Sequence, residues 1–285
     1  MSGRDDEDVV TTESTSAARR DPALSAETDR RYPENPEGVP AWEDGFGRYR
    51  VSFAKTPEEL DEVLRLRFDV FHAELGHGTE GHFRDEDVFD RSCHHLLVRC
   101  DRSGEVVGTY RLMTCTLAES GPGFYSDCEF DLSSLPDDVL RRGVELGRAC
   151  IARAHRGRRV LFLLWRGIGR YLEHNRKRYL FGCASLPTMD PAEVAAHYTM
   201  FRSGGHIARD WIPIRESFRQ EGFESVTSGE MPAGIVVPGL VRGYLQLGAS
   251  VCGGPALDRA FGTTDFFMLL DANEIPPETY RRYVR

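Results

Sequence analysis

Apolar residues recur along the chain with two different periods, which together predict a fold of strands and helices from residue 48 onward. Residues 48–54 (RYRVSFA) alternate in the manner of a half-buried strand. Thr56 and Pro57 then suit a helix start, because Pro is tolerated at the first helical position and Thr is a good capping residue. The apolar positions that follow at helical spacing are Leu60, Val63, Leu64, Phe68 and Phe71.

The same patterns continue to the C-terminus. HHLLVRC and EVVGTYRLMT flank a turn at 101–104 and predict a hairpin. We then expect a strand in VELGRACIA, an amphipathic helix in VLFLLWRGIGRYLEHN and a buried strand in RYLFGCASL. A helix near 191–203, a helix in PGLVRGYLQLGA and a last strand in FFMLLD complete the series. The pattern predicts one α+β domain over residues 48–285.

Charge is distributed unevenly along the chain. Residues 1–47 carry a net charge of −7 and few apolar side chains, so we expect a disordered acidic tail. Residues 141–178 contain twelve bases and two acids, a net charge of +10. We expect an acidic partner or a phosphorylated ligand to dock there, although a solvated basic surface is the alternative.

Composition excludes several classes of protein. The overall net charge of −9 argues against nonspecific nucleic-acid binding. No apolar run reaches the roughly 20 residues that a membrane span needs, and the N-terminus lacks a secretory pattern. Seven cysteines without a Cys-x-x-Cys pair indicate neither a zinc knuckle nor a disulfide framework. We therefore expect a protein of the reducing cytoplasm.

A set of charged and aromatic residues follows a recognisable order. It reads Arg-x-x-x-Phe, Asp-x-x-Asp, Arg and Glu-x-x-Arg, at Arg67, Phe71, Asp87, Asp90, Arg111, Glu145 and Arg148. This order resembles the signature of acyl-homoserine-lactone synthases and their relatives. The stretches FYSDCEFDLSSL, LLWRGIGRYL, LFGCASL and YLQLGASVCGGPALDRAFGTTDFFMLLD resemble the ornithine N-acyltransferases of the GNAT superfamily. The resemblance covers residues 48 to 285.

The resemblance implies a fold and an activity. The fold would be GNAT-like, with a central mixed, mostly antiparallel sheet flanked by helices. The activity would be transfer of a fatty acyl chain, often 3-hydroxylated, from acyl carrier protein to the α-amine of ornithine, which forms lyso-ornithine lipid. No permanently bound cofactor and no metal are expected.

One departure from the GNAT pattern bears on the acyl donor. GNAT enzymes that use acetyl-CoA usually carry Arg/Gln-x-x-Gly-x-Gly/Ala where this chain has RGRRVL at 156–161. Side chains replace both glycines, which disfavours a tight pyrophosphate cradle. Acyl carrier protein is therefore the expected donor, with acyl-CoA possible. The expected docking residues are Arg153, Arg156, Arg158 and Arg159.

Glu145 is the candidate general base. The α-ammonium group of an amino acid must lose a proton before it can attack a thioester, and a positioned carboxylate can accept that proton. Arg148 lies three residues further on and would face away in a regular strand, but a bulge at Gly147 would bring both side chains together. A structural ion pair is the alternative. Arg111 is expected beside them.

Arg67 and Phe71 share one helix face because they stand four residues apart. The resemblance implies that Arg67 joins Asp87, Asp90 and Arg111 in a polar network that orders the loop over the acceptor site. Asp87 and Asp90 could instead hold a cationic amino acid. A core position is the favoured alternative for Phe71, because an aromatic residue on a helix usually packs in the interior.

Two histidine patterns carry little weight. The spacing from His82 to Asp87 matches that of glycerolipid acyltransferases, but about one such match is expected by chance in this composition. His72, His77 and His82 recur every five residues, which is not a same-face helical step, so no metal site is expected. Cys150 and Cys183 are expected to pack as small apolar residues.

Other functions remain open at this point. They are acylation of glycine or another small amine, synthesis of an acyl-homoserine lactone, and binding of acyl carrier protein by a protein without enzymatic activity. The inserted segment at 187–233 could cover an acyl tunnel or touch the membrane, where the product partitions, or could be a structural elaboration. Peripheral contact with the inner face of the membrane is therefore considered alongside a cytoplasmic location.

Overall fold

The computed structural model describes residues 32–74, 83–209, 211–220, 223 and 236–284. These residues belong to a folded unit that begins at Tyr32. The expected disordered tail reached residue 47, and this boundary is wrong. Tyr32 and Val39 are buried, and Asp44 pairs with Arg166 at 2.6 Å. These contacts keep residues 32–47 folded although their composition is acidic. Residues 1–31, the rest of the expected tail, lie outside the described residues.

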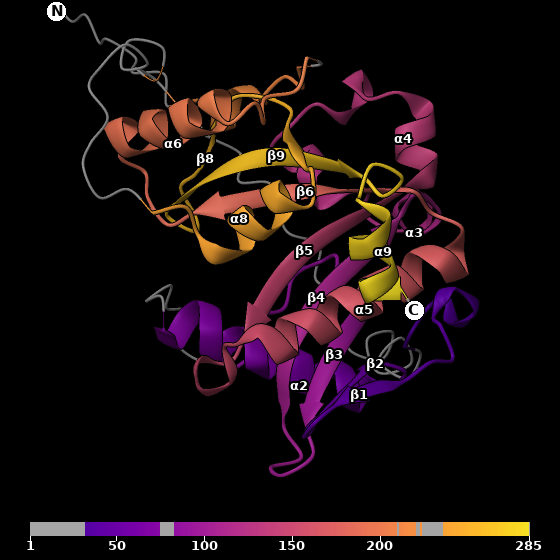
Figure 1. The fold of residues 1–285 in the computed structure, drawn as a ribbon. Coiled ribbons are helices and arrows are strands. Elements are labelled where there is room, and N and C mark those ends of the chain that lie inside the picture. Colours follow the sequence, from indigo (N-terminus) through magenta and orange to yellow (C-terminus); the bar gives the residue numbers. More distant parts are fainter. Residues whose placement is uncertain (1–31, 75–82, 210, 221–222, 224–235, 285) are drawn as a thin grey trace, which may run out of the picture. The chain divides into compact units, whose positions relative to one another are not determined.

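A nine-stranded sheet forms the centre of the unit (Figure 1). Its strands are β1 (Asp44–Phe46), β2 (Tyr49–Phe53), β3 (His94–Cys100), β4 (Val106–Thr114), β5 (Gly143–Ile151), β6 (Tyr179–Leu186), β7 (Ser250–Val251), β8 (Ala256–Asp258) and β9 (Thr263–Asp271). The order is β1-β2-β3-β4-β5-β6-β9-β7, and β8 also pairs with β9. All pairs are antiparallel except β5 with β6. The expected mixed, mostly antiparallel sheet is confirmed.

Helices cover the sheet. They are α2 (Pro57–Phe68), α3 (Cys115–Ser120), α4 (Asp137–Arg142), α5 (Arg158–Asn175), α6 (Pro191–Ser203), α8 (Gly239–Gln246) and α9 (Pro277–Val284). Shorter helical turns lie at η1 (Pro36–Gly38), η2 (Asp69–Glu74), η3 (Tyr125–Cys128), η4 (Leu132–Ser134), η5 (Arg153–His155) and η6 (Glu216–Phe218). The Thr56 hydroxyl accepts the Glu59 N–H, which confirms the predicted start of α2. The sequence patterns did not indicate α3, α4 or α9.

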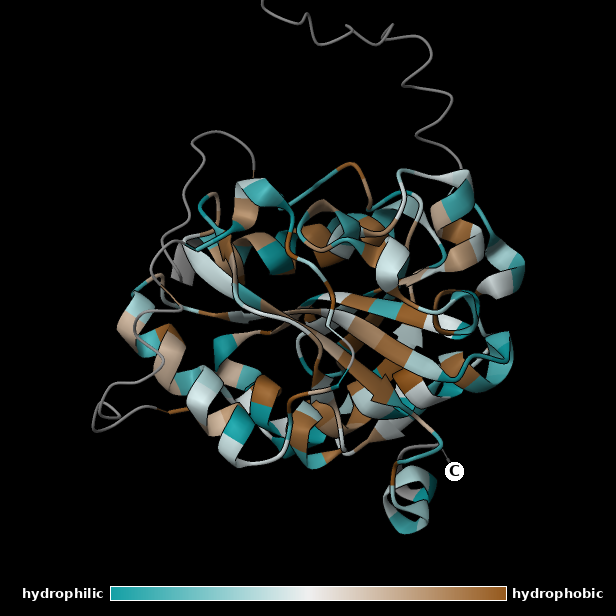
Figure 2. Cartoon of the chain, turned by 90° about the horizontal axis from the view of Figure 1, so that it is seen from above, coloured by the Kyte–Doolittle hydropathy of each residue, from teal (hydrophilic) through white to brown (hydrophobic). Residues whose placement is uncertain are grey.

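Alternate residues of the strands feed two apolar layers, one on each face of the sheet. Leu96 packs in the cluster that contains the buried face of α5, whereas its neighbour Leu97 packs with α2. Phe266 and Phe267 divide in the same way between two clusters. Figure 2 shows the resulting arrangement, in which apolar strands lie between helical layers. Among the described residues, no helix is both long and apolar enough to cross a bilayer.

The only parallel pair of the sheet separates after a few residues. β5 and β6 are paired from Gly143 to Glu145 on one strand and from Tyr179 to Phe181 on the other. At the next position Gly182 has φ +156°, and a Cβ there would lie 2.3 Å from the Leu146 carbonyl oxygen. A side chain is therefore excluded where the strands begin to diverge. The divergence exposes the inner edges of both strands, and it positions the site described next.

Candidate active site

A cavity of about 270 Å³ occupies the space between the diverging strands. Its walls come from β4, β5, β6, the start of α8 and the loop between β8 and β9. The lining residues are Phe71, Tyr110, Arg111, Tyr125, Glu145, Leu146, Gly147, Arg148, Ala149, Cys183, Ala184, Ser185, Pro238, Leu240, Val241, Tyr244, Asp258, Phe261, Thr263 and Asp265. Apolar and charged side chains share the cavity, as a site for an amphiphilic reaction partner requires.

A bulge in β5 lets Glu145 and Arg148 face the same cavity. The pairing of β4 with β5 shifts register between Thr109 and Arg111. On the opposite strand Arg148 adopts φ +49°, a conformation that costs a non-glycine residue free energy and is concentrated at functional sites. Its guanidinium lies over the Phe261 ring at 4.5 Å. The bulge expected at Gly147 is thus confirmed next to that residue.

Glu145 is buried and occupies the wall of the cavity, as expected of a base candidate. Its two oxygens accept the backbone N–H groups of Tyr125 at 2.9 Å and of Ser126 at 2.6 Å. Burial raises the pKa of Glu145, while hydrogen bonds from Ser126 and Tyr125 pull it down. The carboxylate therefore anchors η3 and also faces the place where an acceptor would lie.

The predicted polar network is present. Arg67 is fully buried and binds Asp90 through two nitrogens, at 2.5 and 3.1 Å. Arg111 binds both oxygens of Asp87 at 2.6 Å and one of Asp90 at 3.0 Å. Arg148 completes the chain with a bond of 3.1 Å to Asp87. Although burial alone would raise it, the pKa of Asp90 lies below its ordinary value because Arg67 and Arg111 favour the carboxylate.

These bonds leave little capacity for the alternative in which Asp87 and Asp90 hold a cationic amino acid. Besides the arginines, Asp90 accepts the Asp87 N–H and Asp87 accepts the Phe89 N–H. Neither residue lines the cavity, and nor does Arg67. The structure thus joins Arg67, Asp87, Asp90 and Arg111 in one network that supports the cavity from behind. Arg111 and Phe71 do line the cavity, and Phe71 also packs against the apolar cluster on α2.

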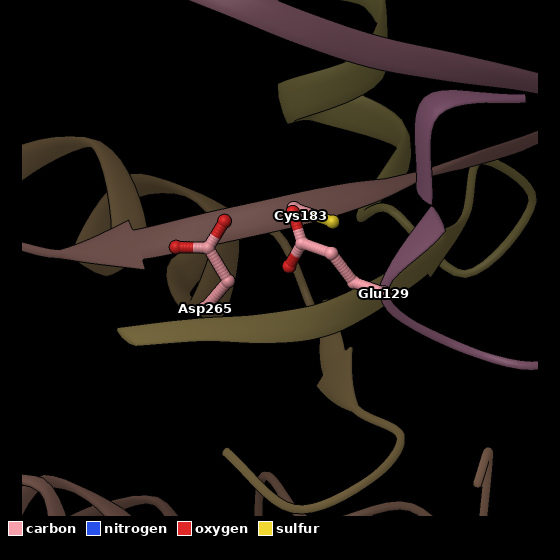
Figure 3. Close-up of side chains that lie close together, drawn as sticks. All are labelled: Glu129, Cys183 and Asp265. Carbon is pink, nitrogen blue, oxygen red and sulfur yellow. The ribbon is translucent and has the colours of Figure 1, made fainter. Parts of the chain in front are cut away.

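A second acidic group, which the sequence analysis missed, lies at the other side of the cavity. Figure 3 shows Glu129, Cys183 and Asp265 with their side chains directed toward one another; their oxygen and sulfur atoms lie within 4.8 Å. Burial, reinforced by repulsion from Asp265 and Asp258, raises the pKa of Glu129 to about 9. Burial also raises the pKa of Asp265 to about 6. The available signal was an acid directly before the apolar run FFMLL.

A basic hollow lies at the N-terminus of α5. Its charged lining residues are Arg48, Arg102, His155, Arg156, Arg158 and Arg159, and no acid is among them. Three of the four expected docking residues therefore surround one hollow. Arg153 is exposed but is not part of the lining. Gly157 precedes α5 in an extended conformation, so the first backbone N–H groups of the helix point toward this hollow without a side-chain cap.

Of the remaining candidates that the structure describes, Cys183 lines the cavity, whereas His72 and Cys150 do not. His77 and His82 lie outside the described residues, and His72 contacts Asp85 at 3.1 Å. Cys150 is buried in the apolar cluster on α2, as expected. Burial and the adjacent acids raise the pKa of Cys183 well above its usual range, which keeps this residue a thiol rather than a nucleophile.

The inserted segment packs on the sheet. Tyr198 stacks on Phe266 and Phe201 meets the same ring edge-on, which fixes α6 against β9. Ile212 is buried in a neighbouring cluster. None of the described residues of 187–233 lines the cavity. The cavity is lined instead by residues that follow this segment in the sequence, namely Pro238, Leu240, Val241 and Tyr244.

A sheet that opens between two parallel strands, with the cavity in the opening, defines a GNAT-type acyltransferase. In agreement, residues 66–166 match the family described as Acetyltransferase (GNAT) domain. The chain is 34% identical to the L-ornithine N(alpha)-acyltransferase of Brucella abortus over 81% of its length and 86% of that protein. It is 31% identical to the enzyme of the same name from Agrobacterium fabrum, over 81% and 83%. The chain belongs to the L-ornithine N(alpha)-acyltransferase family and is an acyltransferase.

Among solved structures, the AHL synthase LasI aligns with a TM-score of 0.45 and 16% identity, over 79% of this chain and 91% of that chain.

Proposed function

We propose that the protein transfers a fatty acyl chain from acyl carrier protein to the α-amine of ornithine, which yields lyso-ornithine lipid. The acceptor is supported by the shared name of the relatives. The observation that carries the chemistry is a buried carboxylate, Glu145, in a cavity that also has an apolar wall. A thioester carbonyl and an amine can meet there out of bulk water.

The reaction is an aminolysis. The α-nitrogen of the acceptor attacks the thioester carbonyl, a C–N bond forms and the C–S bond breaks. Glu145 accepts the proton that the nitrogen loses, directly or through water, and the departing sulfur is protonated to a thiol. Backbone N–H groups along the open edge of β5 would stabilise the negative charge on the carbonyl oxygen.

The acyl chain has a place beside this centre. A small apolar pocket adjoins the main cavity through Leu146, Cys183, Ala184 and Tyr244. Its further lining includes Trp165, Leu180, Met268 and Leu270. Apolar burial in this direction would hold a fatty chain while its thioester remains at β5.

The basic hollow supports a carrier-protein donor. The phosphopantetheine arm carries one phosphodiester, and acyl carrier protein presents an acidic surface, so both would be attracted to the arginines at the start of α5. Arg158→Ala and Arg159→Ala should each raise the KM for acyl carrier protein about fivefold, with a smaller effect at high salt. An unchanged KM for the carrier, or a greater preference for acyl-CoA in the wild type, would contradict this assignment.

A reconstituted assay tests the function directly. Purified protein, 3-hydroxyacyl carrier protein and ornithine should yield N-acyl-ornithine, identified by mass spectrometry of the organic extract. Glu145→Gln should reduce kcat by about 10² to 10⁴ while binding of the carrier persists. Exposed Glu105→Gln on the hairpin between β3 and β4 is the matched control. Formation of N-acyl-glycine, with ornithine left unmodified, would contradict the proposed acceptor.

A further inference from the structure

Three buried carboxylates lie together at one side of the cavity without a cation of their own: Glu129, Asp258 and Asp265. None of the ion pairs between described residues includes any of them. Arg111 and Arg148 line the same cavity, but their ion pairs are with Asp85, Asp87 and Asp90. Arg148 attracts Asp265 without forming a pair. No basic side chain among the described residues therefore forms an ion pair with this group.

Glu129 is the least satisfied member. Its side chain is fully buried, and neither of its oxygens has a hydrogen-bond partner among the described residues. The Tyr125 hydroxyl and the Cys183 thiol are close enough to lower its pKa slightly, but neither forms a bond of ordinary geometry. A buried carboxyl group without donors is costly, so its retention here points to a donor that arrives from outside.

The other two acids are held in place and border the cavity. One oxygen of Asp258 accepts the N–H groups of Ala260 and Phe261, at 2.9 and 3.1 Å. Asp265 accepts the Thr263 hydroxyl at 3.2 Å. Both carboxyl groups are thereby oriented before any ligand binds, which reduces the side-chain conformational entropy that is lost on binding.

The wall of the cavity also offers a donor without a partner. The Nε of Arg148 is buried and has no hydrogen-bond partner among the described residues. Its strained backbone conformation projects the side chain toward the cavity instead of along the sheet. The unpartnered guanidinium N–H of Arg148 and the carboxyl groups of Asp258 and Asp265 thus border one space, and an oxygen of Glu129 lies within 4.8 Å of one of Asp265.

We propose that this space is the acceptor subsite, in which Arg148 binds the α-carboxylate of an amino acid and Glu129, Asp258 and Asp265 bind a second ammonium group on its side chain. The inference rests on the proposed function. Carboxylates only accept hydrogen bonds and an ammonium group only donates them, so the two are matched. With its side-chain ammonium held there, the acceptor presents its α-amine to Glu145. The acid group therefore determines which of two amines is acylated.

Comparison of ornithine with norvaline tests the subsite, because norvaline has the same carbon chain without the second amine. The wild type should favour ornithine in kcat/KM by about 100-fold or more. In Asp265→Asn and in Glu129→Gln this preference should fall at least tenfold, mainly through a higher KM for ornithine, while the rate with norvaline changes little. Glu105→Gln, which removes one exposed acid at the far hairpin, should keep the wild-type preference.

The outcomes separate this inference from the proposed function. If the wild type forms N-acyl-ornithine but both variants keep its full preference over norvaline, the subsite is wrong and the function stands. If the wild type acylates neither amino acid, the function itself fails. Metal ligation by Glu129, Asp265 and Cys183 is the competing use of this group. A stoichiometric metal in the purified protein, together with loss of activity on chelation, would overturn the inference. Circular dichroism of each variant serves as the control for folding.

Discussion

The two acidic regions that flank the cavity are built in opposite ways. On one side Asp85, Asp87 and Asp90 are matched by Arg67, Arg111 and Arg148, and the charges balance within the protein. On the other side Glu129, Asp258 and Asp265 have no such partners. The same residue types therefore serve two purposes: a balanced set holds a wall rigid, whereas an unbalanced set can change its partners when a ligand binds.

The contrast also appears in the pKa values. The arginines lower the pKa of Asp90, whereas burial, with a smaller contribution from neighbouring acids, raises the pKa of Glu129 and of Asp265. The arginines keep Asp85 and Asp90 ionised at neutral pH, whereas Glu129 retains its proton there and can release it to accommodate a cation.

The largest effect should follow from removing one charge of the balanced set. Arg67→Met leaves Asp85 and Asp90 buried without their main partner, which should lower the free energy of unfolding by about 3 to 5 kcal/mol. Chemical denaturation measures it. Arg65→Met removes the exposed partner of Asp61 and should cost at most about 1 kcal/mol. If the two variants lost the same free energy of unfolding, the buried Arg67 network would contribute no more to stability than an exposed ion pair.

The two sets should also respond to pH with opposite sign. Because the native state keeps the Glu129 proton up to a pKa of about 9, the unfolded state releases it first. The free energy of unfolding should therefore fall with rising pH between about 4.5 and 9, by about 1.4 kcal/mol per pH unit for one group. Glu129→Gln should remove this slope, as measured by denaturation at several pH values.

Asp90 should show the reverse dependence. Its lowered pKa stabilises the native state above the unfolded value near 4, and that contribution disappears as the pH falls further. The difference between the wild type and Asp90→Asn should thus be constant above about pH 5 and shrink in acid. If the free energy of unfolding of the Glu129 and Asp90 variants differed from that of the wild type with the same pH dependence, the proposed difference between the two regions would be wrong.

The smallest effect concerns stability without ligand. Near pH 4, both the native and the unfolded states carry the Glu129 proton, so Glu129→Gln should change the free energy of unfolding there by no more than about 1 kcal/mol. Added ornithine should raise the Tm of the wild type but not that of the variant. A loss as large as that of Arg67→Met would mean that Glu129 is part of the structural framework.

The network of Arg67, Asp87, Asp90 and Arg111 was predicted through the resemblance to the family signature. The sequence alone indicated local features: Arg67 and Phe71 share a helix face, and Arg111 and Glu145 belong to strands whose alternation is evident. The strands and long helices were predicted from the same kind of local pattern. The boundary of the acidic tail was not, since Tyr32 and Val39 are buried by contacts with distant residues.

The unbalanced region was invisible for the complementary reason. Glu129 follows an irregular turn, and Asp265 lies at the start of β9, 136 positions later in the sequence. Each acid alone resembles a surface residue beside a turn. Only the pairing of β6 with β9, which sets Ser185 opposite Asp265, brings the acids to the cavity.

The most direct test is a crystal structure of the protein with ornithine bound. The side-chain nitrogen should lie within about 3 Å of an oxygen of Asp265 or Glu129, the carboxylate against Arg148 and the α-nitrogen toward Glu145. An ornithine molecule with its side-chain nitrogen on Asp87 or in solvent, or with its α-nitrogen directed away from β5, would contradict the assignment.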